Sequence, residues 1–385
     1  MELWTDMMDK GLDWDCIYLD FSKAFDRVPH IRLQMKLEAC GISGKVLDWL
    51  SSFLSNRRQS VALGSNHSEW QNVTSGIPQG SVLGPLLFVV FINDLPDQVQ
   101  SFTKLFADDT KVFRAITSIE DHQILQNDLH KLVQWSEIWQ LPFNIEKCKV
   151  IHHSKNNPEA DYMMADTNVT TDTVEKDLGV TFDCSLQFST HIRNITAKAN
   201  SRVGLLKNCF SCMDKENFLP LYRSQVRPLL EYCSSIWNPI LKRDVLEIEK
   251  VQHRATKLVP SLSELPYPER LKALNLKTLA FRRKRTDIIQ VFRIIRGIDN
   301  LDFGNFFKEN INITRGHRLK LAKPRVATRM RQHSFSQRII NLWNSLPHYA
   351  VEAKTINSFK NAINKAWAND PLQYDIPIDY NPLLL

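Results

Sequence analysis

The chain has 385 residues, of which 43% are hydrophobic and 24% charged. This is the composition of a globular protein and excludes wholesale disorder. Its longest strongly apolar run, Leu86 to Ile92, is far shorter than the ~20 residues of a membrane helix, so we expect no membrane span. The first residues lack a signal-peptide pattern, and seven scattered cysteines favour a reducing compartment. We therefore expect a nuclear or cytoplasmic protein that is not secreted.

The net charge of +7 is divided unevenly along the chain. Residues 1–192 carry 16 Lys and Arg against 26 Asp and Glu, whereas residues 193–385 carry 33 against 16. An acidic half joined to a basic half suggests a polyanionic partner for the second half. A solvated surface with a charge bias explains the same composition, and both interpretations stay open.

Hydrophobic periodicity predicts strands and short helices in the first half and long helices in the second. A boundary near residue 187 separates the two halves, and we divide the chain into residues 1–187, 188–300 and 301–385. The elements predicted in the first half are a strand over 15–20, helices over 33–40 and 45–54, a hairpin of strands 104–107 and 110–113, a helix over 118–139, and strands over 148–152 and 178–182.

Aspartates stand at the ends of the predicted apolar strands. Asp20 ends the first strand, and Asp108 and Asp109 form the tip of the hairpin. Hard divalent ions such as Mg²⁺ prefer oxygen ligands, and two such ions about 3.5–4 Å apart can clamp both oxygens of an in-line displacement at phosphorus. Aspartate is also a normal turn residue, so Asp108 and Asp109 taken alone could form only a turn.

The residues around these aspartates resemble the palm motifs of reverse transcriptases. YLDFSKAFDRVPH (residues 18–30), SGIPQGSVLGPLLF (75–88) and FADD (106–109) are similar to the first three motifs, in the family's order and at its usual intervals. The resemblance extends from about residue 12 to about residue 185. It is strongest to reverse transcriptases of non-LTR (LINE-type, jockey-like) retrotransposons.

This resemblance implies an α+β fold: a right-hand polymerase palm, with an antiparallel sheet and packed helices, lacking most of the fingers. A mostly helical thumb and C-terminal region would follow. The implied activity is RNA-directed DNA polymerisation with two Mg²⁺ ions, an RNA template, a DNA primer and dNTP substrates. Asp20, Asp108 and the backbone carbonyl of Phe21 would bind the metals. Asp109 would have a weaker metal role, and mutual repulsion of the carboxylates would make the site metal-dependent.

The resemblance also implies residues for nucleotide binding. Phe25 would exclude the ribose 2′-OH, although a core phenylalanine is the alternative. Gln79 would read the nascent base pair beside Gly80, and Lys23 would contribute positive charge. Lys147 of NIEK (residues 144–147) would protonate the pyrophosphate leaving group, but a solvated surface lysine explains it equally well.

Further residues are implied to contact primer and template. Gly76 and Pro78 would shape the backbone beside the base pair. Leu178 and Gly179 resemble the primer-grip hairpin, or else form a strand with a bulge. Positive charge would also come from Arg57 and Arg58.

The chain departs from the family at its start, since only 19 residues precede Asp20. We therefore expect an N-terminally truncated enzyme with impaired activity. The alternative is an inactive remnant that binds nucleic acid through its basic half, and a third possibility is a helical module that docks a protein.

The basic half contains the remaining candidates. Arg282 to Arg285 is the densest basic run and could bind phosphate, act as a nuclear address or form a solvated helix face. Cys209 and Cys212 have the spacing of half a zinc site, but a helix with two thiols is favoured. Arg315 to His317 and LWNSLP (residues 342–347) look like the tail of such reading frames. The residues predicted to line a duplex are Lys198, Arg202, Lys207, Arg223 and Arg227.

Overall fold

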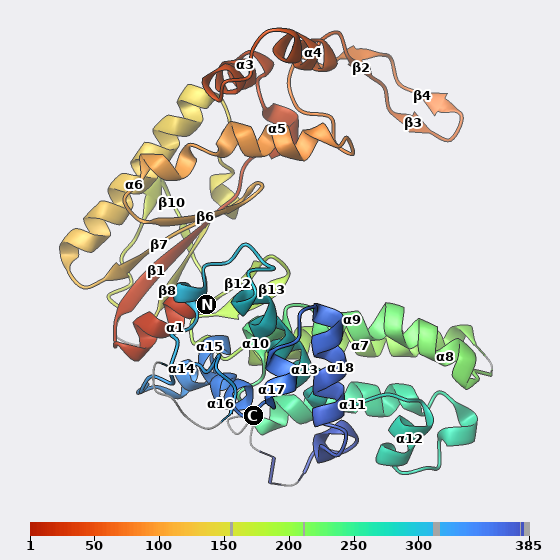
Figure 1. Ribbon diagram of the computed structural model, residues 1–385. Coiled ribbons are helices and arrows are strands. Elements are labelled where there is room, and N and C mark those ends of the chain that lie inside the picture. Colours follow the sequence, from red (N-terminus) through yellow and green to blue (C-terminus); the bar gives the residue numbers. More distant parts are fainter. Residues whose placement is uncertain (155–156, 211, 311–315, 378, 381–385) are drawn as a thin grey trace. The chain divides into compact units, whose positions relative to one another are not determined.

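The structure is a computed structural model that describes residues 1–154, 157–210, 212–310, 316–377 and 379–380 (Figure 1). By their contacts these residues form two compact units. Residues 12–178 form the first, which we call the sheet unit, and residues 1–11 and 179–385 form the second, which we call the helical unit. The predicted domain boundaries at residues 187 and 300 stay predictions.

The sheet unit is built on five strands in the order β11, β8, β1, β7, β6 (Figure 1). The central strand β1 is antiparallel to both of its neighbours, and β6 and β7 form an antiparallel hairpin, whereas β11 pairs parallel to β8. The α+β prediction is thereby confirmed. The strands are β1 (Asp13–Leu19), β6 (Phe102–Phe106), β7 (Asp109–Ile116), β8 (Lys149–His153) and β11 (Thr170–Thr171).

The apolar sequence of β1 fits its central place in the sheet. A strand covered on both faces must be apolar at successive positions, without the alternation of a half-exposed strand. Trp14, Cys16 and Ile17 are fully buried, and Leu19 is buried as well. Asp20 therefore directly follows a strand whose side chains are mostly buried in the core.

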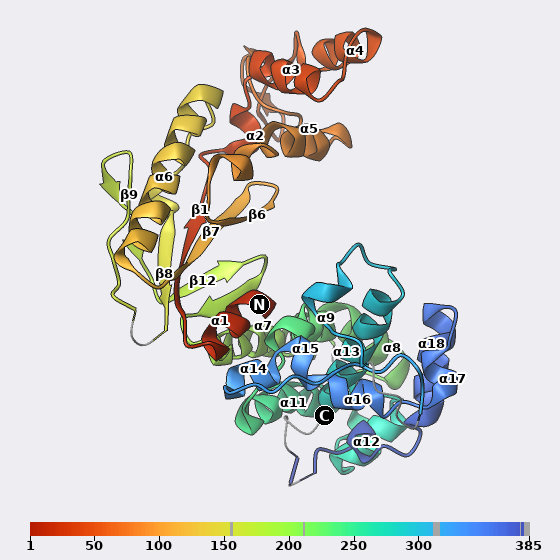
Figure 2. The ribbon, with the colours of Figure 1, turned by 60° about the vertical axis from the view of Figure 1, so that its left-hand side comes forward.

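Helix α6 (Ile119–Trp139) packs along the sheet and buries Leu125, Leu129 and Leu132 (Figures 1 and 2). Their i, i+4, i+7 spacing places the three leucines on one face of the helix. The other helices are α2 (Ala24–Arg27), α3 (His30–Ala39), α4 (Lys45–Leu54) and α5 (Leu83–Ile92), with 3-10 turns at Leu95–Gln98 and Ile145–Lys147. Short strands complete the unit: β2 (Arg58–Gln59), β3 (Ala62–Leu63), β4 (Asn66–His67), β5 (Gln71–Asn72), β9 (Met163–Met164), β10 (Thr167–Asn168) and β12 (Val174–Asp177).

The apolar run Val82 to Ile92 is buried on one face only. Leu87 and Phe88 lie in the core, but Val82 is 95% exposed and Leu86 59% exposed. An apolar run with no polar face gives no signal of which side meets the core, so the sequence pattern could not have shown this.

The helical unit confirms the prediction of long helices in the second half (Figure 2). Its core includes fully buried Trp237, Trp343 and Phe359. No helix among the described residues is long and apolar enough to span a bilayer. The main helices are α1 (Glu2–Asp9), α7 (Ser189–Cys209), α8 (Lys215–Leu221), α9 (Arg227–Glu231), α10 (Ser234–Trp237), α11 (Lys242–Thr256), α12 (Tyr267–Ala273), α13 (Leu279–Ile295), α14 (Arg329–His333), α15 (Phe335–Arg338), α16 (Ile340–Asn344), α17 (His348–Val351) and α18 (Ile356–Ala366). Strand β13 (Val180–Asp183), a π-helical turn (Tyr222–Val226) and 3-10 turns at Pro260–Leu262, Phe303–Asn305 and Pro371–Gln373 complete it.

Candidate active site

The hairpin of β6 and β7 carries Asp108 and Asp109 at its tip. Phe106 pairs with Asp109, so Ala107 and Asp108 form the turn between the strands. Ala107 has a φ of +53°, a left-handed conformation that costs a residue with a side chain roughly 1–2 kcal/mol. This conformation closes the tight turn between β6 and β7 that presents the two carboxylates.

The register of the sheet brings Asp20 to the same edge as Asp109. Leu19 of β1 pairs with Thr110 of β7, so one further step along both strands leads to Asp20 and Asp109. Antiparallel partners have Cα atoms about 4.5–5.5 Å apart. The two carboxylates, 89 positions apart in the chain, are therefore brought together by strand pairing.

A backbone bridge fixes the position of Asp20. Phe21 pairs with Phe143, and their rings stack with centroids 4.5 Å apart. The carbonyl of Asp20 accepts a hydrogen bond from the Asn144 N–H at 2.7 Å, and Ser22 N–H donates to the carbonyl of Pro142 at 2.9 Å. The carbonyl of Phe21 is not an acceptor in either bond of this bridge.

A cleft of about 520 Å³ lies at this edge of the sheet unit. Within it, Nζ of Lys147 lies 3.6 Å from Oδ2 of Asp20, and the two side chains are 69% and 40% exposed. Lys111 and Asp177 form a more buried ion pair. The lining residues are Tyr18, Leu19, Asp20, Lys104, Leu105, Phe106, Asp109, Thr110, Lys111, Glu146, Lys147, Lys149, Glu175, Lys176, Asp177 and Leu178.

The carboxylates of the cleft act on one another. The pKa of Asp109 is raised by partial burial and then by the negative charges of Asp108, Asp177 and Asp20, while Lys111 opposes the rise. A raised carboxyl pKa means that the charged form is disfavoured. A cation placed among these groups would relieve the repulsion.

The donor chemistry of the cleft suits a hard divalent ion, because aspartate oxygens are the ligands that Mg²⁺ prefers. Among the described residues, however, no three His, Cys, Asp or Glu side chains are gathered tightly enough to hold a metal ion. The carboxylates lie within electrostatic reach of one another without forming a preassembled cage. Metal binding would therefore include a rearrangement of exposed side chains.

The loop that carries Gln79 docks on the segment after β1. Gly76 N–H donates to the carbonyl of Val28 at 2.9 Å, and Ile77 N–H donates to the carbonyl of Phe25 at 2.8 Å. Gly76 has a φ of +89°, and a Cβ there would lie 2.6 Å from the carbonyl oxygen of Asp26. The glycine is thus required by close backbone packing, whatever its role towards nucleic acid.

Several residues predicted to bind nucleotide or template line a second, polar pocket of about 570 Å³. Lys23, Arg57, Gly76, Pro78 and Gln79 all contribute to it. Nε2 of Gln79 donates to Oδ1 of Asp26 at 3.0 Å. The structure therefore groups these five predicted residues, with Asp26 as a partner that the sequence had not indicated.

Phe25 stacks on Phe88 with ring centroids 4.5 Å apart and is half-buried. It packs against the core and still reaches solvent, so neither interpretation of this residue is excluded. Gly80 has a φ of +82°, and no described residue lies within 4 Å of its Cβ position. Arg58 is separate from the pocket and lies over the ring of Trp70, 5.9 Å from its centroid.

The predicted primer-grip pair falls where the division between the two units lies. Leu178 has a φ of +46° and Gly179 a φ of +84°, so the two residues form a turn between β12 and β13 and interrupt the single strand predicted over 178–182. Leu178 lines the first cleft. A Cβ on Gly179 would lie 3.2 Å from the Tyr232 ring, within the helical unit.

Sequence reasoning missed Lys111 and Asp177 of the first cleft. Lys111 stands two residues after Asp109 on β7, and side chains two apart in a strand share a face. This periodicity was the one available signal. Asp177 pairs with Lys111 from a strand 66 residues later, for which the sequence held no indication.

The side chains of the basic run Arg282 to Arg285 do not form a freely solvated helix face. Each side chain is engaged within the helical unit: Arg282 with Glu231, Arg283 with Asn238, Lys284 with Asp370 and Arg285 with Asn364. Arg283 is buried to 2% exposure. These contacts correct the interpretation as a solvated face, whereas phosphate binding and a nuclear address stay predictions.

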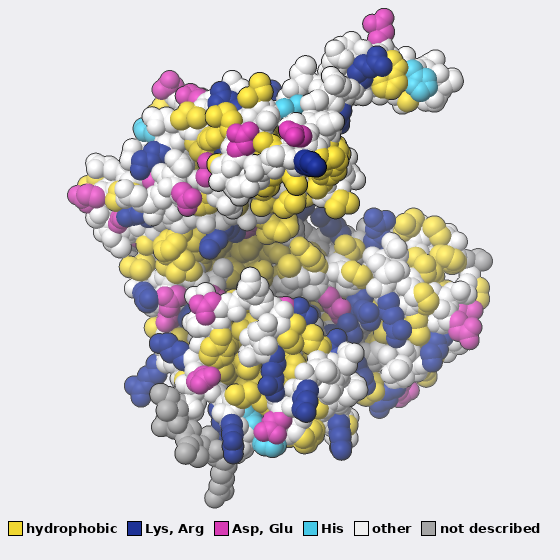
Figure 3. Space-filling model, turned by 45° about the horizontal axis from the view of Figure 1, so that its top comes forward, with side chains coloured by type: hydrophobic (Ala, Val, Ile, Leu, Met, Phe, Trp, Pro, Cys, Tyr) yellow, Lys and Arg dark blue, Asp and Glu magenta, His cyan; other side chains and the backbone are white. Residues whose placement is uncertain are grey.

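The other predicted basic residues remain at the surface. Lys198, Arg202, Lys207 and Arg223 are exposed, and Arg227 is half-buried beside Glu231 at 3.7 Å. On the face seen in Figure 3, Lys and Arg side chains are spread over the helical unit without forming one patch.

The cysteine pair gives no sign of a metal site. Cys209 and Cys212 are exposed, Ser211 between them lies outside the described residues, and no group of three or more His, Cys, Asp or Glu side chains is gathered around the pair among the residues described. Arg315 of the predicted tail motif also lies outside it.

Comparison with known proteins agrees with the motifs. Residues 5–182 match the family model described as reverse transcriptase (RNA-dependent DNA polymerase). The probable RNA-directed DNA polymerase from transposon X-element of Drosophila melanogaster is 29% identical over 63% of this chain and 28% of that protein. The RNA-directed DNA polymerase from mobile element jockey of Drosophila funebris is 28% identical over 65% of this chain and 28% of that protein. The chain thus spans less than a third of the length of these relatives.

Solved structures resemble the chain more distantly. A telomerase from Candida tropicalis in complex with a TWJ fragment of telomeric RNA is 10% identical, with a TM-score of 0.42 over 96% of this chain and 50% of that chain. Such a score is too low to establish a shared fold. Residues 5–182 are therefore similar to the reverse transcriptase family, and the chain is similar to the polymerases of mobile elements such as jockey.

Proposed function

We propose that the sheet unit catalyses RNA-directed DNA polymerisation. In this reaction the 3′-OH of a DNA primer attacks the α-phosphorus of a dNTP paired with an RNA template, and pyrophosphate leaves. The observation that carries the proposal is the sheet register, which sets Asp20 opposite the Asp108–Asp109 turn at the edge of a cleft. The family match supports it, since reverse transcriptases use divalent metal ions.

Asp20 and Asp108, with the carbonyl of Phe21, would hold two Mg²⁺ ions, which supply charge stabilisation to the attacking and leaving oxygens. Asp109 would tune the local charge, which is supported by its coupling to Asp108 and Asp20. Lys147 would donate a proton to the leaving pyrophosphate. Its position 3.6 Å from Asp20 supports this role, because a general acid must stand within reach of the reacting group.

The polar pocket around Gln79 would receive the nucleotide and template. Gln79 and Gly80 would contact the base pair, and Lys23 and Phe25 the triphosphate and sugar. Support comes from the shared lining of this pocket by Lys23, Gln79 and Arg57. The residues that would contact primer or template are Gly76, Pro78, Arg57, Arg58, Leu178 and Gly179. The exposed cations of the helical unit would bind phosphates without sequence choice.

The test is Mg²⁺-dependent extension of a DNA primer on an RNA template by the full chain. Asp108→Ala is expected to abolish extension while RNA binding persists. Asp161→Ala, which removes an exposed carboxylate of the same unit, is the matched control and should extend normally. Extension by Asp108→Ala at the wild-type rate would remove Asp108 from the mechanism. Binding by the wild-type chain without any extension would favour the inactive nucleic-acid-binding remnant.

A further inference from the structure

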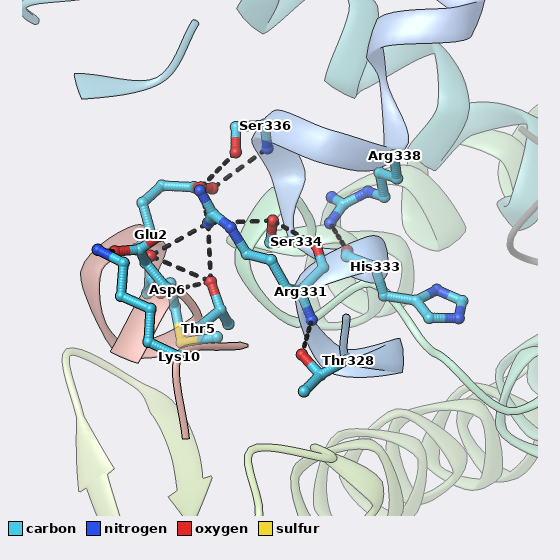
Figure 4. Close-up of polar contacts among 11 residues, drawn as sticks. Glu2, Thr5, Asp6, Lys10, Thr328, Arg331, His333, Ser334, Ser336 and Arg338 are labelled. Carbon is cyan, nitrogen blue, oxygen red and sulfur yellow. Dashed lines mark hydrogen bonds and ion pairs between the residues drawn. The ribbon is translucent and has the colours of Figure 1, made fainter. Parts of the chain in front are cut away.

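The C-terminal tail of the chain contains two segments, Arg315 to His317 and residues 342–347, that look like the tail of related reading frames. The proposed reaction assigns no role to this tail. Residues 327–338 of this tail include α14 and α15 and belong to the helical unit. Helix α1 belongs to the same unit, although it stands at the opposite end of the sequence and directly precedes the sheet unit. Figure 4 shows polar side chains of α1 and of this tail segment pointing toward one another.

Glu2 binds the tail through both of its carboxylate oxygens. Oε2 accepts hydrogen bonds from Nη1 of Arg331 at 2.7 Å and from Oγ of Ser336 at 2.5 Å, and Oε1 accepts one from Ser336 N–H at 3.2 Å (Figure 4). Arg331 also donates to Oγ1 of Thr5 at 2.9 Å. The Glu2 and Arg331 side chains are only 17% and 13% exposed, so this pair is more shielded from water than an ordinary surface ion pair.

Asp9 makes a second polar contact one helix turn beyond Thr5. Its Oδ1 accepts hydrogen bonds from the N–H groups of Ala327 and Thr328 at 2.9 and 2.6 Å, and from Oγ1 of Thr328 at 2.9 Å. Thr328 is at the same time the N-cap of α14 and accepts from Arg331 N–H. Asp9 and Arg331 are therefore linked through one capping residue.

The three contacting positions share one face of α1, because Glu2, Thr5 and Asp9 follow the i, i+3, i+7 spacing of a helix. A different pair of residues on α1, Trp4 and Met7, is buried, and the Trp4 ring meets Phe182 of β13 edge-on with centroids 5.6 Å apart. Strand β13 is the first element after the sheet unit. The segments that lead into and out of residues 12–178 thus both pack within the helical unit.

We propose that residues 327–336 form a docking site for helix α1. Through this site the C-terminal tail would stabilise the segment that directly precedes the sheet unit. The hydrogen-bond donors of this site match a helix with carboxylates at two positions seven residues apart and a hydroxyl between them. Desolvated carboxylates need their hydrogen bonds satisfied, so this match selects α1 over a merely hydrophobic helix. The proposal does not depend on the polymerase reaction.

Hydrogen exchange of the full chain, followed by mass spectrometry, tests this proposal. We expect exchange of residues 2–9 to become at least tenfold faster in Glu2→Gln and in Arg331→Ala, while α13 keeps its protection. Asp6→Asn and Arg329→Ala are the controls and should leave α1 unchanged, because Asp6 pairs with Lys10 of its own helix and Arg329 is exposed. Unchanged exchange of residues 2–9 in both variants would overturn the proposal. Equal loss of protection in α1 and α13 would also overturn it, because Arg331 would then be a general determinant of the fold.

Discussion

Lys147 and Asp20 face each other across the cleft, with Nζ 3.6 Å from Oδ2. They reach this position from different strands, since Asp20 follows β1 and Lys147 precedes β8, which pairs antiparallel with β1. The pairing of Tyr18 with Lys149 brings these two strand ends to one edge of the sheet. A cation beside a carboxylate is suited either to proton donation or to charge balance, and the two roles can be separated by experiment.

If Lys147 is the general acid, Lys147→Met should lower kcat by roughly 10²–10⁴-fold, the usual contribution of a positioned acid. The apparent affinity for primer and template should change little. Steady-state primer extension measures both quantities. Lys131→Met, on α6, is the control. A variant that keeps its kcat and loses only affinity would assign Lys147 to charge balance.

Asp109 gives the site a pH dependence whose sign follows from its raised pKa. An acid with a higher pKa in the folded state binds more protons there than when unfolded, so its contribution favours folding at low pH and is lost as the pH rises through the folded pKa. Without divalent ions at pH 7, Asp109→Asn should therefore raise the thermal unfolding temperature slightly. The gain should shrink at pH 4 and also with saturating Mg²⁺. A gain that is the same at both pH values would show that the carboxylate charge is not its cause.

Gly76→Ala should destabilise the sheet unit strongly, because the new methyl group would meet the backbone of Asp26 at 2.6–2.9 Å and the positive φ would add strain. Overpacking of this kind costs typically about 1–3 kcal/mol. Gly80→Ala shares the positive φ but has free space among the described residues, so it should cost only the roughly 1–2 kcal/mol of the left-handed conformation. Urea unfolding of both variants gives the comparison. Equal losses would mean that the docking against Asp26 is not as close as described.

Phe25→Ala tests the two interpretations of this ring. As a sugar selector, Phe25 excludes ribonucleotides, so the variant should incorporate rNTPs with a kcat/KM closer to that for dNTPs. Removal of the stack on Phe88 also predicts a loss of stability, roughly 3–5 kcal/mol for a buried phenylalanine and less at this half-buried position. The ratio of dNTP to rNTP incorporation separates the roles, because it is independent of the fraction folded. An unchanged ratio of dNTP to rNTP incorporation would show that Phe25 acts only as a core residue.

Local patterns predicted much of the sheet unit. The strand ending at Asp20, the hairpin at Asp108–Asp109 and the buried face of α6 all follow from periodicity within one segment, and the structure has them at nearly the predicted bounds. Burial of a charged run is different, because it depends on partners far along the chain. Arg282 pairs with Glu231, 51 residues away, and Lys284 pairs with Asp370, 86 residues away. The local sequence around the run does not indicate these partners.

The sequence pattern did not indicate the buried polar networks either. Nδ1 of His152 lies 2.7 Å from Oδ1 of Asp15, and the hydroxyl of Tyr162 donates to Oδ2 of the same carboxylate at 2.5 Å. Asp15 is fully buried, so these partners are needed to satisfy it. The residue type alone does not distinguish this buried structural carboxylate from the partly exposed Asp20 five positions later.

The central claim is that Asp20 and the Asp108–Asp109 turn hold the same divalent ions. The most direct measurement replaces Mg²⁺ with Fe²⁺ and maps where ascorbate and peroxide cleave the backbone of the full chain, because hydroxyl radicals act close to the bound iron. We predict cleavage near both residue 20 and residues 108–109, suppressed by excess Mg²⁺ and lost at both places in Asp108→Ala. Cleavage at only one of these segments, or cleavage near residue 20 that persists in Asp108→Ala, would contradict a shared site.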